Sequence, residues 1–159
     1  MSNIFERTEN FNPIEYFKIP EDFQPMYTSD KFIYLLTGGR GSTKSFNVAL
    51  YIMLSSFKKF HNILYTRYTM SNTETSIMKE FMEKIDIFDM GSYFEVKGNT
   101  IRNTMTGSMI FFDGIKTSSG NQTAKLKGFK DLTMAIVDEA EEWQSEEEFD
   151  KLLGSIRNP

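Results

Sequence analysis

The sequence lacks several residue types that common kinds of site require. It contains no cysteine, which excludes disulfides and thiolate metal sites. Its single histidine, His61, excludes a metal centre built from several imidazoles, and we expect it at the solvated start of a strand. No apolar run approaches the roughly 18 residues of a membrane helix, and residues 1–6 have neither the basic nor the apolar part of a signal peptide. We therefore expect a protein of the reducing cytosol with no membrane partner.

The composition is that of one domain with a real core. The chain has 159 residues, of which 40% are hydrophobic and 25% charged. Its net charge of −4 does not favour a surface that coats nucleic acid broadly, although a local basic patch at Lys125, Lys127 and Lys130 is possible. The 15 phenylalanines and 10 methionines are interpreted as core filling rather than as a cofactor site.

A glycine-rich segment lies between an apolar run, residues 32–36, and an amphipathic run, residues 46–57. Strand, glycine-rich turn and Lys-Ser at a helix start is the layout of a phosphate-binding loop. Backbone N–H groups of such a turn converge on phosphate oxygens, and the helix dipole adds positive potential. We expect Lys44 to reach the β- and γ-phosphates and Ser45 to bind Mg²⁺. The residues expected to line the nucleotide are Gly38, Gly39, Arg40, Gly41, Ser42, Thr43, Lys44 and Ser45.

Thr43 departs from the usual pattern, which has a second glycine at this position. If the position requires φ > 0, a β-branched residue costs about 1–3 kcal/mol there. If the position is already near the helical region, threonine is acceptable, and we expect this because three other glycines supply flexibility. The competing interpretation of the segment is an ordinary glycine-rich turn with a lysine nearby.

A second segment supplies acidic residues. An apolar strand over residues 132–137 is followed by Asp138 and Glu139. We expect Asp138 to hold Mg²⁺ and Glu139 to act as the general base that deprotonates the attacking water. Arg40 either reaches the γ-phosphate or a neighbouring subunit, or is a solvated arginine paired with an acid. Arg67, at the end of another strand, is a second candidate for sensing phosphate.

The remaining pattern predicts a parallel three-layer α/β fold with a small antiparallel insertion at 93–113. Residues 1–30 read as an irregular lead-in to a domain at 31–159. The acidic stretch 141–150 is interpreted as a solvated helix face, and 116–130 as a loop. Strands are expected at 32–37, 62–67, 93–96, 100–102, 108–112 and 132–137, and helices at 46–57, 76–87 and 149–153.

These residues together resemble the ATPase domain of a tailed-bacteriophage terminase large subunit, from about residue 20 to the last. The resemblance is carried by the Gly-Gly-Arg-Gly-Ser loop at 38–42, Arg67, Thr106-Gly107-Ser108 before the apolar run 110–112, Lys125-Leu126-Lys127-Gly128, and the run from Ile136 to Glu142.

The resemblance implies a P-loop NTPase fold and an ATP-driven motor that packages double-stranded DNA into a procapsid. By position it implies ATP and Mg²⁺ as ligands, Lys44, Glu139 and Arg40 as catalytic residues, and Ser45 and Asp138 as metal ligands. Gln24 lies where an adenine-reading glutamine can lie. Implied partners are DNA, a portal protein, a small terminase subunit and further copies of the chain, in the cytoplasm of an infected bacterium.

The same resemblance implies that the C-terminal part of the ATPase domain and the nuclease domain are absent from this chain. An incomplete parallel sheet leaves an apolar edge, which predicts poor solubility or a partner chain. Two other functions stay open at this point: another P-loop ATPase, such as a helicase or recombinase core, and a nucleotide-binding or assembly fragment without turnover of its own.

Overall fold

The computed structural model describes residues 12–39, 41–58, 60–68, 74–114, 129, 131–143 and 145–156. The chain forms two compact units, Met1–Leu54 and Ser55–Pro159. The first unit contains α1 (Pro13–Tyr16), η1 (Glu21–Phe23), α2 (Pro25–Thr28) and most of α3 (Lys44–Lys58). Its described lead-in is helical rather than irregular, so that prediction was wrong. The reason is that Pro13 and Pro25 start helices, where a missing N–H costs nothing.

The predicted strand at 32–37 was also wrong. None of the five strands in the described part of the chain includes or pairs with these residues. Three apolar side chains of this run are exposed: Phe32 to 60%, Ile33 to 54% and Leu35 to 80%. An apolar run has strand propensity, but it becomes a strand only where a neighbour supplies ladder hydrogen bonds and cover. The run therefore reaches the glycine-rich loop as irregular chain.

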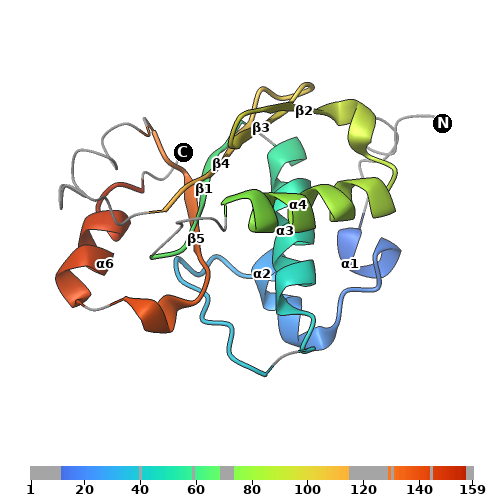
Figure 1. Ribbon diagram of the computed structural model, residues 1–159. Helices are drawn as coiled ribbons and strands as arrows, with labels where there is room; N and C mark the ends of the chain where they lie inside the picture. The colour runs from blue at the N-terminus through green and yellow to red at the C-terminus, as the bar shows by residue number, and fades with distance from the viewer. Residues whose placement is uncertain are drawn as a thin grey trace. The chain divides into compact units, whose positions relative to one another are not determined.

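The second unit is built on a five-stranded mixed sheet with the order β2-β3-β4-β1-β5 (Figure 1). Strands β4, β1 and β5 are parallel, whereas β2, β3 and β4 are antiparallel neighbours. This confirms an α/β sheet that is parallel in part and carries an antiparallel insertion. The strands are β1 (Asn62–Thr66), β2 (Phe94–Lys97), β3 (Thr100–Asn103), β4 (Met109–Phe112) and β5 (Met134–Val137).

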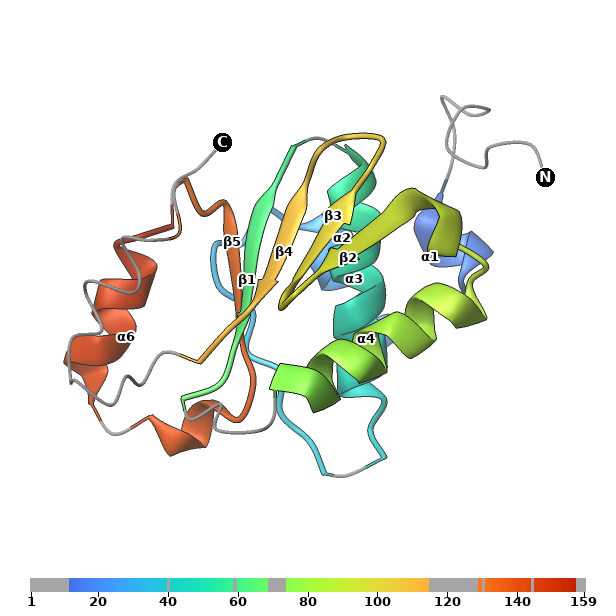
Figure 2. The same ribbon diagram turned by 45° about the horizontal axis from the view of Figure 1, so that its top comes forward.

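Two helices cover opposite faces of this sheet (Figure 2). On one face, Phe81 of α4 (Glu74–Ile87) packs edge-on against Phe112 of β4, whose ring stacks on Tyr65 of β1. On the other face, Leu152 of α6 (Glu146–Leu153) forms a buried cluster with Leu64 of β1. Because alternate residues of a strand point to opposite faces, the apolar run of β1 supplies both layers.

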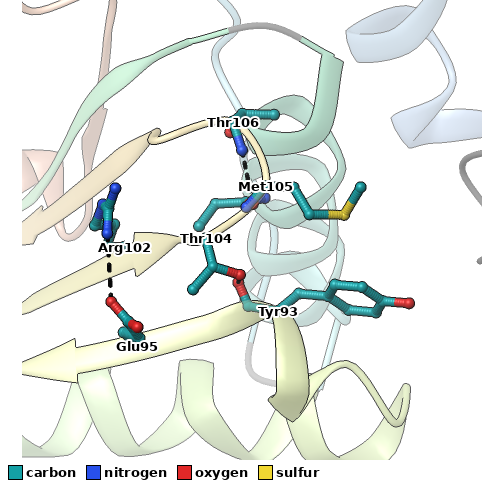
Figure 3. Close-up of polar contacts among 7 residues, drawn as sticks. Tyr93, Glu95, Arg102, Thr104, Met105 and Thr106 are labelled. Carbon is teal, nitrogen blue, oxygen red and sulfur yellow. Dashed lines mark hydrogen bonds and ion pairs between the residues drawn. The ribbon is translucent and has the colours of Figure 1, made fainter.

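The antiparallel insertion is a hairpin followed by a tight turn (Figure 3). Glu95 of β2 and Arg102 of β3 are paired across the strands, with Nη1 and Oε2 3.4 Å apart. Thr104 Oγ1 donates to the carbonyl of Tyr93, and the N–H of Met105 donates to the side-chain oxygen of Asn103. The antiparallel hairpin of β2 and β3, with η2 (Gly91–Tyr93) before it, confirms the predicted insertion.

His61 is buried, not solvated as predicted, because its ring has a specific partner in the fold. Its Nδ1 lies 2.8 Å from Thr133 Oγ1, and Thr133 also accepts from the N–H of Asn62. The histidine therefore joins the start of β1 to the segment that leads into β5.

The acidic segment behaves as predicted, with most of its carboxylates exposed on η3 (Ala140–Glu142) and α6. Ser145 caps α6 by accepting from the N–H of Glu148 at 3.3 Å, and Glu147 pairs with Lys151 at 2.7 Å one turn along. Among the described helices, none is long and apolar enough to cross a membrane.

Candidate functional site

The glycine-rich loop of the first unit is closed by its own lysine. Lys44 Nζ donates to the carbonyl of Gly38, to the carbonyl of Gly39 at 3.3 Å and to Ser42 Oγ at 2.8 Å. A compact ring of oxygens thus surrounds the ammonium group, which holds the turn together. A phosphate at this loop would offer the same ammonium group stronger, charged acceptors.

Gly38 requires its lack of a side chain. Its φ of +143° is one that L-residues rarely adopt, and a Cβ there would lie 3.3 Å from Ser42 Oγ and 3.6 Å from Lys44 Nζ. Gly39, in contrast, has open space where a Cβ would lie. The loop therefore needs its first glycine for a close approach of Ser42 and Lys44, a role that sequence spacing alone does not assign.

Thr43 has φ = +57°, so the expectation of a near-helical conformation was wrong. The residue takes the left-handed conformation that the second glycine of the usual pattern would take, at a cost of roughly 1–2 kcal/mol for an L-residue. Two hydrogen bonds hold it there: Asn47 Nδ2 donates to the carbonyl of Thr43 at 3.0 Å and to Thr43 Oγ1 at 3.1 Å. Because a side-chain hydrogen bond contributes about 0.5–1.5 kcal/mol, the pair offsets the backbone cost.

Three other residues were predicted to bind the nucleotide or its metal: Ser45, Gln24 and Arg40. Ser45 is exposed at the start of α3, where a helix begins with unpaired N–H groups. Gln24 donates from Nε2 to the carbonyl of Ile19 at 3.1 Å, within the helical lead-in. Arg40 lies outside the described residues, as do the lysines of the predicted basic patch. The described loop residues therefore form one closed turn in unit 1.

In the second unit, both predicted acids contact one arginine. Arg67, just after β1, places Nη2 2.7 Å and Nε 2.9 Å from Asp138 Oδ2, with Nη2 also 3.5 Å from Glu139 Oε1. Their side chains are 21%, 26% and 44% exposed respectively. Partial burial lowers the pKa of Arg67, but the hydrogen bond and charge of Asp138, followed by the charge of Glu139, outweigh it and raise that pKa above its usual value.

Glu139 also has a left-handed backbone, with φ = 51° and ψ = 51°. It lies two residues after β5 and directly before η3, and its carbonyl accepts the N–H of Glu142 at 3.0 Å. A non-glycine residue in this region is strained, and such residues cluster at functional sites. This left-handed conformation turns the chain sharply at Glu139, directly after Asp138.

These charged side chains lie at one edge of the sheet, because β4, β1 and β5 are parallel and end together. The ladder continues past the strands: the N–H of Asp138 donates to the carbonyl of Thr66, and the N–H of Asp113 donates to the carbonyl of Tyr65. Asp113 thus directly follows β4 at this edge, a position that the sequence did not reveal because the hairpin pattern obscured the strand's parallel neighbour. Burial, with the charge of Asp138 adding to it, raises the pKa of Tyr65.

The donor set of this edge suits a hard cation, since carboxylate oxygens are what Mg²⁺ prefers. Among the residues that the structure describes, however, no three acidic or histidine side chains are grouped as a complete cation cage. Any cation here would therefore take part of its shell from water or from a ligand, as Mg²⁺ commonly does with phosphates.

The fold and its charged groups define the chain as an α/β protein whose ionic residues gather at the carboxyl ends of parallel strands. The family profile described as "Phage terminase large subunit" matches residues 30–159. The chain therefore belongs to the phage terminase large subunit family, which confirms the resemblance found in the sequence.

Two relatives agree with this family. The large terminase subunit of Bacillus phage SPP1 is 29% identical over 129 residues, which cover 77% of this chain and 29% of that protein. The PBSX phage terminase large subunit of Bacillus subtilis strain 168 is 26% identical over 140 residues, covering 87% of this chain and 30% of that protein. The chain thus spans less than a third of the length of these relatives.

Proposed function

We propose that this chain carries the ATP-binding and ATP-hydrolysing residues of a phage DNA-packaging motor. The observation that supports it most directly is the pairing of Asp138 and Glu139 with Arg67 at the carboxyl edge of the parallel strands. An apolar strand followed by two acids, and a glycine-rich loop whose Lys-Ser begins a helix, match two parts of a P-loop NTPase site. Family membership supports the same assignment.

Each residue has a distinct role in this proposal. Lys44 leaves the carbonyls of its own loop and donates to the β- and γ-phosphates, while the loop N–H groups bind the remaining phosphate oxygens. Asp138 and Ser45 would hold Mg²⁺, which when bound offsets the charge on the transferred phosphoryl group. Arg40 would add positive charge at the γ-phosphate, and Gln24 would contact adenine.

Glu139 is proposed as the general base. Its carboxylate accepts a proton from water as the water oxygen bonds to the γ-phosphorus, and the bond from that phosphorus to the bridging oxygen breaks to release ADP. Arg67 holds this carboxylate and that of Asp138 in the absence of a cation, so it keeps the two acids from repelling each other. Double-stranded DNA, a portal protein, a small terminase subunit and further copies of the chain are the proposed partners, in the cytoplasm of an infected bacterium.

The test separates binding from turnover in the 159-residue chain. Calorimetry would measure Mg·ATP affinity, and phosphate release would measure turnover with and without double-stranded DNA. Lys44→Ala should weaken binding about tenfold or more, since it removes a charge-assisted contact. Glu139→Gln should keep binding and lower turnover by about 10²–10⁴-fold, the usual contribution of a general base.

Two matched variants control for the loss of charge alone. Lys58→Ala removes an exposed lysine from the other end of α3, and Glu141→Gln removes an exposed carboxylate from η3. Both should behave as wild type. Turnover at the wild-type rate in the double variant Lys44→Ala, Glu139→Gln would refute the proposal. Tight binding without turnover in the wild type would instead favour a nucleotide-binding fragment.

A further inference from the structure

One buried side chain contacts the residue that replaces a glycine in the phosphate-binding loop. Asn47 lies in the first turns of α3 and is only 3% exposed. Its Nδ2 donates to both the carbonyl and the hydroxyl of Thr43, and its backbone N–H donates to the same carbonyl at 3.0 Å. Asn47 therefore fixes the backbone and the side chain of Thr43 together.

The conformation that these bonds hold is one that Thr43 adopts reluctantly. Its φ of +57° is left-handed, and a β-branched residue there is a genuine outlier. Thr43 stands directly between Ser42 and Lys44, which are themselves joined by a hydrogen bond of 2.8 Å. A relaxation of Thr43 to negative φ would redirect the chain at this point, and with it the N–H groups and the lysine stem on either side.

We propose that Asn47 is a positioning residue for nucleotide binding. By its hydrogen bonds to Thr43 it stabilises the positive φ that a glycine adopts freely at this position of the usual loop. The inference deepens the proposed function and rests on it. Asn47 touches no phosphate in this proposal; it acts only through Thr43. Its amide matters because it is a donor, and it matters only while residue 43 is not glycine.

A double-mutant cycle tests this dependence directly. The four proteins are the wild type, Asn47→Ala, Thr43→Gly and the double variant, and the probe is Mg·ATP measured by calorimetry. Asn47→Ala alone should weaken binding about tenfold, since two hydrogen bonds that hold the loop are lost. In the Thr43→Gly background the same change should weaken binding less than about twofold, because glycine reaches positive φ at little cost. Equal losses in the two backgrounds would overturn the inference and leave Asn47 as a stabiliser of α3.

Unfolding midpoints of the same four proteins provide the second readout. Asn47→Ala should lower the midpoint more in the Thr43 background than in the Thr43→Gly background, and additive effects would contradict the inference. As a control, Asn103→Ala removes another buried amide, which donates to Ser56 Oγ at 3.0 Å, and its effect should be the same in both backgrounds. If the wild type fails to bind Mg·ATP, the proposed function is wrong, and the midpoints still decide whether Asn47 holds Thr43.

Discussion

Replacing Arg67 by glutamine tests the charged edge of the sheet most sharply. The change keeps much of the side chain's length and removes the positive charge that three contacts share, at 2.7, 2.9 and 3.5 Å. These contacts form two ion pairs, one with Asp138 and one with Glu139. At such separations and an effective dielectric of about 20, each ion pair is of order 5 kcal/mol before the cost of desolvation is subtracted. The net value must therefore be judged from burial.

The side chains of Arg67 and Asp138 are 21% and 26% exposed, which places the pair between two known cases. Exposed ion pairs contribute about 0–1 kcal/mol, and breaking a buried pair costs about 3–5 kcal/mol. We expect Arg67→Gln to lower the free energy of unfolding by about 2 kcal/mol, because the ion pairs are lost. The loss stays below that of a fully buried pair because both carboxylates regain water. In a chain of this size that corresponds to a fall of roughly 4–8 °C in the melting temperature.

Urea unfolding of the wild type, Arg67→Gln and Arg102→Gln would measure this. Arg102 is the matched control, since its single contact with Glu95 is 3.4 Å long and exposed, and its loss should cost no more than about 0.5 kcal/mol. Arg67 also competes with any cation for Asp138, so MgCl₂ should raise the midpoint of Arg67→Gln more than that of the wild type. Equal losses in the two variants, or an unchanged magnesium effect, would refute this account of the edge.

Three further substitutions test the core, the loop and a buried phenol. Leu152→Ala, at a fully buried position, should cost about 2–5 kcal/mol in urea unfolding, whereas Leu153→Ala at a half-buried position should cost less; equal costs would contradict the described packing. Gly38→Ala should lower the unfolding midpoint because of its positive φ and its contact with Ser42, while Gly39→Ala should not, and the reverse order would contradict the loop geometry. Because the pKa of Tyr65 is raised by burial, its contribution to stability is complete below pH 10 and is lost as the pH rises further; Tyr65→Phe should remove a decline of about 1.4 kcal/mol per pH unit from denaturation curves, and an unchanged slope would exclude this origin.

Much of the second unit could be predicted from its sequence. The apolar runs of β1 and β4, the turn residues of the hairpin and the helical spacing before Ile87 are all local features, so short windows contain the information. The pairing of Arg67 with Asp138 was not predictable, because it depends on β1 and β5 being neighbours across 71 sequence positions. Sequence placed both residues at strand ends, and the register brought them together.

Backbone conformation accounts for the remaining differences. Thr43 and Glu139 both have positive φ, which is unusual for residues other than glycine. The sequence does not predict it, because it depends on the surrounding hydrogen bonds and on where a strand ends. Residues 32–37 have the composition of a buried strand, yet a strand is a property of two segments and the described chain offers them no partner. The assignment to the terminase family does not depend on these local conformations, because it rests on the order of the motifs along the chain.

In each unit a basic side chain contacts residues to which we assign a role in binding the nucleotide or its metal. The Lys44 ammonium lies on carbonyl oxygens of its own loop, and the Arg67 guanidinium lies on the carboxylate proposed for Mg²⁺. In the proposed site, ATP without Mg²⁺ would bring its phosphates to Lys44 with no divalent cation to offset the rest of their charge. Mg²⁺ alone would have to displace Arg67 without a phosphate to complete its shell.

The two ligands should therefore favour each other, and linkage requires that the effect be reciprocal. We expect calorimetric ATP affinity to be at least about tenfold higher with MgCl₂ than with a chelator, a difference of about 1.4 kcal/mol. In Arg67→Gln that ratio of ATP affinities should fall. Without Arg67, Mg²⁺ reaches Asp138 with no cation to displace, so its binding depends less on the phosphates of ATP. A ratio that is the same in the variant would mean that Arg67 does not control access to Asp138, and the carboxylates would then be held by the arginine for stability alone.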